Sequence, residues 1–552
     1  MLFHFFKLTK SKSLLLLFLI PVASAVEISV SYLLQLITDT ATGKSSLSYL
    51  NLVLLVLIYI LVDALIYFLS AYLEQTTLNE ILSITKNKLL SAMFLQKTGI
   101  GHDVKKITTD YYNDFTATTD ILRSDYLQGS INCYKQVCQF IIAISLSLMI
   151  KPLLSFLIIL LCLPGLLLPF YKQKNLKDNK HHLIAVSKKY TNYLQDFTNG
   201  LRTIQLFNLQ TKLTHIFQQQ NQKLLKSQNK DQLTRKQIGG VSQLLDDFLY
   251  LGTWVVGIYF VLQKSITLGQ LVAFSQLMIF ISQPIQSASG LIGDVIGGKE
   301  AATKITEQTK ASTEKSQSLK LAKLKSLNYE NVSYAVSQKE ILKNIQLNFD
   351  SDKHYLLVGK SGSGKSTLIN LPVSQTSFEG EILINNRPLY RYNLSEIVQN
   401  LSLLEQDSYL FSNSLKDNLS LYSNKISNQE LLNVLKIVGL EKYASVDNLI
   451  SQNNNFSGGE KRRIVLGRVL LRQTMFNIFD EPLTGLDPKT AHDISQILIN
   501  LKSGWITVTH QFDQRLFQNA DQIIVLDNGS VQAQGTLDNS NIKNWLKKLN
   551  LH

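Results

Sequence analysis

The stretch VGKSGSGKST at residues 358–367 has a composition suited to binding phosphate. Its glycines let backbone N–H groups close around phosphate oxygens without interference from a Cβ atom. Lys365 can reach the terminal phosphates, Ser366 can offer its hydroxyl to Mg²⁺, and the helix expected to follow directs its positive end at the anion. The apolar stretch HYLLV precedes this loop, so the order is strand, loop, helix, as a Walker A motif requires, and a chance glycine-rich turn is a poor alternative. The predicted phosphate-binding residues are Gly359, Lys360, Ser361, Gly362, Ser363, Gly364, Lys365, Ser366 and Thr367.

Two carboxylates follow an apolar strand in MFNIFDEP, residues 475–482. Asp480, at the end of the strand, suits a water-mediated hold on Mg²⁺. Glu481 is placed to polarise an attacking water, which is the role of the general base in a hydrolase. Asn477 lies inside the strand, where a buried amide needs hydrogen-bond partners that the sequence does not identify.

A second phosphate-binding element is the helix start Ser457, Gly458 and Gly459, whose free N–H groups can bind an anion. The surrounding NFSGGEKRRIVLGRVLL, residues 455–471, resembles the signature motif of ATP-binding cassette (ABC) transporters. The resemblance implies that this signature faces the Walker A loop of a second cassette, so that two cassettes sandwich two ATP molecules.

Three shorter motifs in the same order extend the resemblance to the ABC family. LLEQDSYLF is similar to the Q-loop, which implies that Gln406 contacts Mg²⁺ and the attacking water. LTGLDP resembles the D-loop and carries Asp487 near the nucleotide, and ITVTHQ resembles the switch region, with His510 on the γ-phosphate. ATP and Mg²⁺ are therefore the expected cofactors, with Glu481, His510 and Gln406 catalytic and Ser366, Gln406 and Asp480 holding the metal.

The cassette also departs from the family pattern. Val336 aligns with the position where exporters usually carry an adenine-stacking tyrosine, while Tyr334 falls on a core position. The signature continues with Glu460 rather than Gln, and this carboxylate is expected to point away from the phosphate or to meet a cation. The stretch NLISQNNN before the signature lacks the usual acidic coupling motif.

The first three hundred residues are strongly apolar, and the whole chain is 45% hydrophobic and only 17% charged. A bilayer core requires roughly twenty apolar residues per helix. Six candidate spans are predicted at about 13–37, 48–73, 134–150, 153–171, 243–263 and 268–292. The first has a rival interpretation as a signal peptide, because basic residues precede it and ASA follows, but its apolar pattern continues past the cleavage position.

Lysines predict the orientation of these spans. Lys7, Lys10 and Lys12 precede the first span and place the N-terminus in the cytosol. The segments 74–133 and 172–242 are polar and rich in lysine, so they are expected to be helical extensions into the cytosol. Six spans return the chain to that side, where ATP is available. The predicted location is therefore a cell membrane, crossed several times, and specifically the plasma membrane of a bacterium.

The predicted fold is a polytopic α-helical membrane domain of exporter type with six transmembrane helices, joined to an α/β P-loop NTPase cassette. The predicted boundaries are 1–300 for the membrane domain, 301–326 for a linker and 327–552 for the cassette. The net charge of +14 fits contact with anionic membrane lipid, and no nucleic-acid module is recognisable. Cys133, Cys138 and Cys162 indicate neither a zinc site nor a disulfide framework.

In the membrane half, ITLGQLVAFSQLMIFISQPI (266–285) and LQDFTNGLRTIQLFN (194–208) resemble the last span and the second cytosolic loop of ABC exporters. The implied protein is half of a dimeric exporter that hydrolyses ATP to move a small molecule, lipid or peptide by alternating access. Its partner is a second half-transporter, identical or different, and the sequence does not identify its substrate. The alternatives are a membrane sensor that cycles ATP without transport, and import through an exporter-type fold.

Charged residues inside spans are costly and are therefore candidate substrate contacts. Glu27 lies midway through the first span and Asp63 within the second. A substrate with a cationic group is one hypothesis, and the favoured alternative is a hydrogen bond between helices or a water-filled vestibule.

Overall fold

The computed structural model describes residues 2–95, 104–153, 155–156, 178–179, 182–183, 185–311, 319–336, 339–374, 376–405, 409–450 and 456–551. The chain divides into two compact units. The first comprises Met1–Leu95 and Thr108–Thr313, and the second comprises Gln96–Ile107 and Glu314–His552.

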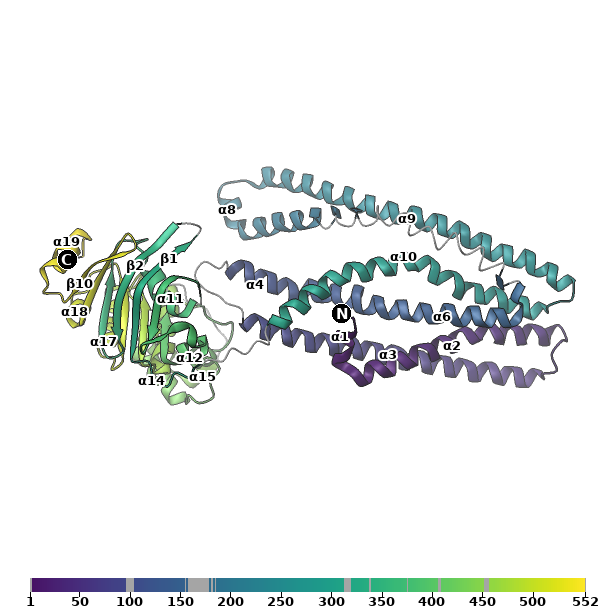
Figure 1. The fold of residues 1–552 in the computed structure, drawn as a ribbon, viewed down its shortest axis with the longest axis horizontal. Coiled ribbons are helices and arrows are strands. Elements are labelled where there is room, and N and C mark those ends of the chain that lie inside the picture. The colour runs from purple at the N-terminus through teal and green to yellow at the C-terminus, as the bar shows by residue number, and fades with distance from the viewer. Residues whose placement is uncertain are drawn as a thin grey trace. The chain divides into compact units, whose positions relative to one another are not determined.

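The first unit is helical, and helices α2, α3, α6 and α10 run alongside one another (Figure 1). Its described segments are α1 (Leu2–Phe6), η1 (Lys7–Thr9), α2 (Lys10–Ala41), α3 (Tyr49–Leu95), the end of α4 (Val104–Asn113), η2 (Asp114–Thr118), α5 (Thr119–Ile121), η3 (Leu122–Gln128), α6 (Gly129–Ile150), α8 (Leu201–Leu206), α9 (Gln210–Leu262) and α10 (Leu268–Ala311). Segments η2 and η3 are π-helical, a geometry that is rare and often found at functional sites.

Within the described residues, four helical stretches are long and apolar enough to cross a membrane, at Leu2–Ala41, Tyr49–Leu95, Asp110–Ile150 and Leu268–Lys310. A shorter apolar helical segment, Asp247–Leu262, lies where the fifth span is predicted. The span predicted at 153–171 falls almost wholly outside the described residues. The number of spans and the boundaries between membrane domain, linker and cassette remain predictions.

A glycine allows close packing between α10 and the π-helical segment η3. A Cβ atom at Gly298 would lie 2.6 Å from the backbone nitrogen of Tyr126, so no larger residue fits without a backbone shift. The same region holds an apolar cluster that joins α2, α3, η3 and α10 and includes Leu78, Ile81 and Ala302.

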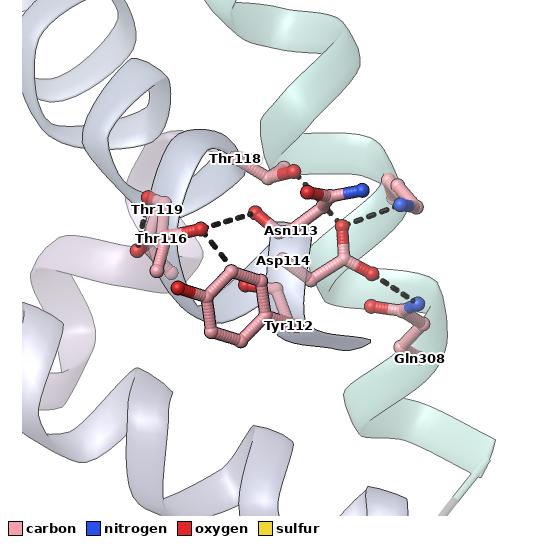
Figure 2. A network of polar contacts seen from close by, with 8 residues as sticks. Tyr112, Asn113, Asp114, Thr116, Thr118, Thr119 and Gln308 are labelled. Atoms are coloured by element: carbon pink, nitrogen blue, oxygen red, sulfur yellow. Dashed lines mark hydrogen bonds and ion pairs between the residues drawn. The ribbon is translucent and has the colours of Figure 1, made fainter. Parts of the chain in front are cut away.

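A buried carboxylate ties η2 to α10 (Figure 2). Asp114 is fully buried, and its Oδ2 accepts a 2.8 Å hydrogen bond from Nε2 of Gln308. Its Oδ1 accepts from the hydroxyl of Thr118 at 2.8 Å and forms an ion pair with the Lys304 ammonium. Because burying an unpaired charge is costly, this arrangement fixes the position of α10 against the segment that follows α4.

A second interhelical network accounts for Glu27 in α2. Its Oε2 accepts a 2.9 Å hydrogen bond from Gln139 and lies 3.2 Å from the Lys135 ammonium, both on α6. The structure therefore favours the alternative weighed above, in which Glu27 joins two helices, over a direct contact with a cationic substrate.

The second unit is an α/β domain with two sheets. The first sheet has the order β2-β1-β4-β5 and the second has the order β10-β9-β3-β8-β7-β6. The strands are β1 (Ser326–Val336), β2 (Lys339–Asp350), β3 (His354–Val358), β4 (Glu379–Ile384), β5 (Arg387–Pro388), β6 (Leu401–Leu404), β7 (Phe476–Asp480), β8 (Gly504–Thr509), β9 (Gln522–Asp527) and β10 (Ser530–Gly535). Strands β9, β3, β8, β7 and β6 are parallel, so their carboxyl ends meet at one edge of the sheet.

Helices cover the sheets of this unit. They are α11 (Lys365–Ser374), η4 (Leu389–Arg391), α12 (Leu394–Asn400), α13 (Leu415–Ser420), α14 (Asn428–Ile437), η5 (Glu441–Tyr443), α15 (Val446–Ile450), α16 (Gly458–Arg472), α17 (Pro488–Ile499), α18 (Gln514–Asn519) and α19 (Ser540–Lys548). Successive residues of β3 alternate between two apolar clusters, with Leu356 in one and Leu357 in the other. The parallel sheet is thus buried on both faces, which explains the uninterrupted apolar runs of its strands.

The structure also explains Asn477 in β7. Its Oδ1 accepts a 2.8 Å hydrogen bond from Thr474, and its Nδ2 donates to the hydroxyl of Ser503 at 2.7 Å. The buried amide is therefore satisfied, and it links β7 to the loop before β8.

Candidate nucleotide-binding site

The glycine loop connects β3 to α11 at the carboxyl edge of the parallel sheet. Gly362 and Gly364 have φ angles of +78° and +100°, which L side chains rarely adopt. A Cβ atom at Gly359 would lie 2.1 Å from the carbonyl oxygen of Leu526 on β9. Three of the residues predicted from the sequence are therefore glycine because of backbone geometry and space.

Lys365 begins α11 and is nearly buried, with 5% of its surface exposed. Its ammonium donates to the carbonyl oxygens of Gly359 and Lys360 at 2.8 and 2.9 Å, which holds it within the curve of the loop. Burial lowers the pKa of this ammonium from its ordinary value, and the carboxylates of Glu481 and Asp480 oppose the shift. The arrangement places a lysine side chain against a compact, anion-accepting loop.

Asp480 ends β7 and is a buried carboxylate, 5% exposed. Burial raises its pKa, while a hydrogen bond with the Ser366 hydroxyl lowers it. Its Oδ1 is buried without a hydrogen-bond partner in the part of the chain that the structure describes. An orphaned carboxylate oxygen beside a serine hydroxyl is a donor set that Mg²⁺ accepts, so these residues fit the predicted metal.

The other hydroxyls of the loop differ in their surroundings. Ser363 is buried, and its Oγ has no hydrogen-bond partner among the described residues. Ser361 is exposed and lines the cavity beside the loop, and Thr367 lies half-buried in the first turn of α11.

Glu481 and His510 come together across the ends of β7 and β8. The distance between Nδ1 of His510 and Oε1 of Glu481 is 2.9 Å. Glu481 has a φ of +53°, a strained value for a residue with a side chain, and its N–H donates to the carbonyl oxygen of Val508. Strain of this kind is maintained when the surrounding structure holds a side chain in a functional direction.

Lys365, Glu481 and His510 line one cavity of about 470 Å³. Its lining residues are Gly359, Lys360, Ser361, Lys365, Glu481, Thr484, His510, Leu549 and Leu551. Sequence reasoning did not identify Thr484, Leu549 or Leu551. Thr484 lies two positions after the EP dipeptide, within LTGLDP, whereas the two leucines belong to an apolar pattern at the C-terminus that gave no signal of proximity.

The signature residues start helix α16 at the surface. Ser457 is the N-cap, and Ser457 and Gly458 are exposed. A Cβ atom added to Gly458 meets nothing within 4 Å. None of Ser457, Gly458 or Gly459 lines the cavity described above, so in this chain the helix start is open to a ligand or partner from outside.

Glu460 meets a cation, as expected from the sequence. It completes a capping box with Ser457, and its Oε1 lies 2.5 Å from the Lys442 ammonium. The hydrogen bond from Lys442, helped by Ser457 and Tyr443, lowers the pKa of Glu460 to about 2. The negative charge is thus neutralised by its own cassette.

This pair predicts a pH dependence. Because the folded-state pKa of Glu460 lies below its ordinary value of 4.5, the pair stabilises the fold above about pH 4.5 and is lost progressively toward pH 2. In Glu460→Gln the midpoint temperature of unfolding should therefore fall less between about pH 4.5 and pH 2 than it does in the wild type. Glu430→Gln is the matched control, since Glu430 closes a similar capping box with Ser427 but is solvent-exposed. If the two variants lose the same amount of this pH dependence, the ion pair between Glu460 and Lys442 is not its cause.

The remaining predicted residues are Asp487 and Gln406. Asp487 is the N-cap of α17, and its Oδ1 accepts a 3.0 Å hydrogen bond from the Thr490 N–H. The Thr490 hydrogen bonds lower the pKa of the Asp487 carboxyl. Gln406 lies outside the described residues.

Val336 ends β1 half-buried against the core, whereas Tyr334 is 6% exposed and packs within it. Tyr334 is therefore unavailable for stacking on adenine, as expected from the sequence.

Val336→Tyr is expected to tighten ATP binding about fivefold, because one aromatic contact contributes on the order of 1 kcal/mol. The measurement is an ATP titration by calorimetry, with Val336→Leu as the control for added bulk. An unchanged affinity would mean that another ring already contacts the adenine.

The fold and the site define a class: a multi-pass helical membrane protein fused to a P-loop nucleotide-binding domain. Residues 13–285 match the family model described as ABC transporter transmembrane region, and residues 342–484 match the one described as ABC transporter. The chain belongs to the ABC transporters and has the architecture of an exporter-type half-transporter, with the transmembrane region and the ATP-binding domain in one chain. This confirms the family and the fold class expected from the sequence, and the ATP-binding domain supports the expected ATPase activity.

Individual relatives agree with this assignment. The chain is 33% identical to the Escherichia coli glutathione/L-cysteine transport system ATP-binding/permease protein CydC over 46% of its own length and 45% of that protein. It is 25% identical to the Escherichia coli microcin-J25 export ATP-binding/permease protein McjD over 93% of this chain and 91% of the relative. The solved structure of a bacterial Atm1-family ABC exporter with ATP bound matches 98% of both chains with a TM-score of 0.82 at 16% identity, which shows a shared fold.

Proposed function

We propose that this chain forms, with a second half-transporter, an ATP-driven exporter that works by alternating access in the plasma membrane of a bacterium. The observation that carries the proposal is the separation of two phosphate-binding elements on one cassette. Lys365, Glu481 and His510 share one cavity, whereas the signature helix start lies exposed elsewhere. Each ATP therefore needs the signature of another cassette, so nucleotide binding drives two cassettes together.

In the proposed site, Lys365 and the glycine loop hold the phosphates of ATP. Ser366 and Asp480 hold Mg²⁺, which neutralises developing negative charge on the phosphates when bound. Glu481 accepts the proton of the attacking water, and His510, 2.9 Å from it, orients the carboxylate and contacts the γ-phosphate. Gln406 and Asp487 are assigned from their motifs, as a ligand of Mg²⁺ and as a contact near the nucleotide.

The orientation of the proposed exporter follows from charge. Lys7, Lys10 and Lys12 keep the N-terminus on the cytosolic side, and an even number of spans places the cassette there too. Closure of the cassettes then turns the pathway outward, and hydrolysis resets it. The chain carries both Glu481 and a nearly regular signature, so it can contribute to a hydrolytic site as a homodimer or beside a different partner.

A crosslinking experiment tests cassette pairing. In a background without Cys133, Cys138 and Cys162, Ser361→Cys and Gly458→Cys on separate copies should form a crosslink only with ATP and Mg²⁺. Lys365→Ala is the control and should abolish this ATP dependence. Absence of the crosslink, both with itself and with partners identified by mass spectrometry of the purified complex, contradicts the proposed mechanism.

A transport assay in vesicles distinguishes the proposed exporter from a sensor without transport and from an importer. Sealed inverted vesicles should accumulate a co-purifying ligand when ATP is supplied outside. ATP hydrolysis without accumulation of any ligand would favour a sensor, and ATP-dependent depletion of preloaded vesicles would favour import.

A further inference from the structure

A cavity of about 610 Å³ lies beside the N-terminal helices of the first unit. It is bounded by α1, η1, the first turns of α2, and α6, with side chains such as Phe6, Leu17 and Ile131 on its walls. Tyr134 closes one side, and its hydroxyl donates to the carbonyl oxygen of Leu17 at 3.1 Å. The walls are almost entirely apolar, so they fit a hydrocarbon group.

Two cations stand among the residues that line this apolar cavity. Lys7 lies in η1 and Lys10 begins α2, and both are exposed. Within the described residues neither forms an ion pair, in contrast to Lys12, whose ammonium lies 2.5 Å from Glu80. Lys7 and Lys10 therefore retain full positive charge for a ligand, while Lys12 is already neutralised.

The position of the two lysines along the chain indicates which class of ligand the cavity binds. Lys7 and Lys10 precede the apolar part of α2, so they lie where a membrane-spanning helix leaves the bilayer. A molecule that combines hydrocarbon with a negative headgroup matches both features, and anionic lipids supply it at this depth. A zwitterionic lipid fits the walls but has no net charge for the two lysines.

We propose that this cavity binds one anionic phospholipid, with an acyl chain between α2 and α6 and the phosphate between Lys7 and Lys10. The bound lipid fixes α1 and η1 against the bundle. Phe5 of α1 is 2% exposed and packs in the cluster that includes Ala302 and Ile305 of α10. Phe5 thus links the helix that bounds the lipid site to α10 within the first unit.

Native mass spectrometry of the full-length protein tests the site. The protein is released from nanodiscs containing equal amounts of phosphatidylglycerol and phosphatidylcholine, and retained lipids are counted. The wild type should keep one phosphatidylglycerol in preference to phosphatidylcholine. Lys7→Gln with Lys10→Gln should lower that preference roughly 30-fold, since each of the two lysines near a membrane surface contributes on the order of 1 kcal/mol.

Two further variants keep the test specific. Lys12→Gln with Lys86→Gln removes the same formal charge from exposed positions that do not line the cavity, and should leave the preference unchanged. Ser130→Phe fills the cavity from α6 without altering charge and should lose the retained lipid. Equal retention of both lipids, or an equal loss in the charge-matched control, overturns the proposal. So does a photocrosslinker at Tyr134 that captures a second polypeptide rather than lipid.

Discussion

Glu481→Gln is expected to reduce steady-state ATP hydrolysis by roughly 100-fold or more, which is the usual contribution of a general base. The carboxylate of Glu481 shares a cavity with Lys365 and lies 2.9 Å from Nδ1 of His510. The amide has the same shape but cannot take a proton from water. ATP binding should persist, because the glycine loop, Lys365 and Ser366 are unchanged, so the variant should accumulate as a closed dimer with trapped ATP.

The measurement combines phosphate release with retention of labelled ATP on the purified dimer. Glu441→Gln is the control, since Glu441 is an exposed carboxylate at the start of η5. If a different partner chain is present, its own base must be replaced as well, so that its site does not mask the result. Wild-type hydrolysis in the variant would show that another group activates the water.

Much of this site could be predicted because its parts are short segments of contiguous sequence. A glycine loop needs its glycines for local reasons, and Gly362 and Gly364 indeed have positive φ angles. Parallel strands bring separate motifs to one edge by a general rule of α/β sheets, which explains why Glu481 and His510, which directly follow the neighbouring strands β7 and β8, come together. The sequence therefore predicts the chemistry and the motif order of the cassette.

Other features depend on contacts between distant segments, which no local pattern specifies. The Ser503 partner of Asn477 and the Lys135 partner of Glu27 lie 26 and 108 positions away in the chain. Each polar residue is conspicuous in its apolar segment, but the partner is an ordinary polar residue among many. Sequence reasoning can identify that a buried polar group needs a partner, whereas the fold decides which one it has.

Asp114 is the most consequential example, because it lies in a polar stretch and gave no signal. Its carboxylate is 0% exposed, whereas the side chain of its partner Lys304 is 46% exposed. The cost of replacing one member of this pair therefore depends on whether the charged group that remains is buried or exposed. Removing Lys304 leaves a buried carboxylate with only neutral donors, whereas removing the charge of Asp114 leaves an ammonium that water can solvate.

Lys304→Met is accordingly expected to destabilise the full-length protein by about 3 kcal/mol, the usual cost of an uncompensated buried charge. Asp114→Asn should cost about 1 kcal/mol, the typical value of the neutral hydrogen bonds at stake. The measurement is thermal unfolding of the detergent-solubilised chain, converted to free energies near the wild-type midpoint. Lys299→Met is the matched control, an exposed lysine on the same helix.

The double variant Asp114→Asn with Lys304→Met separates charge from packing. If an unneutralised carboxylate causes the loss, adding Asp114→Asn to Lys304→Met should recover roughly 1 to 2 kcal/mol. The oxygen of the neutral amide can still accept from Thr118, and its Nδ2 can donate to Oε1 of Gln308 once the Gln308 amide turns over. Additive losses would instead mean that the Lys304 stem supports α10 through apolar contact. Recovery of stability together with reduced ATP-driven transport would indicate that the ion pair itself, and not only the packing around it, holds α10 in the position needed for coupling.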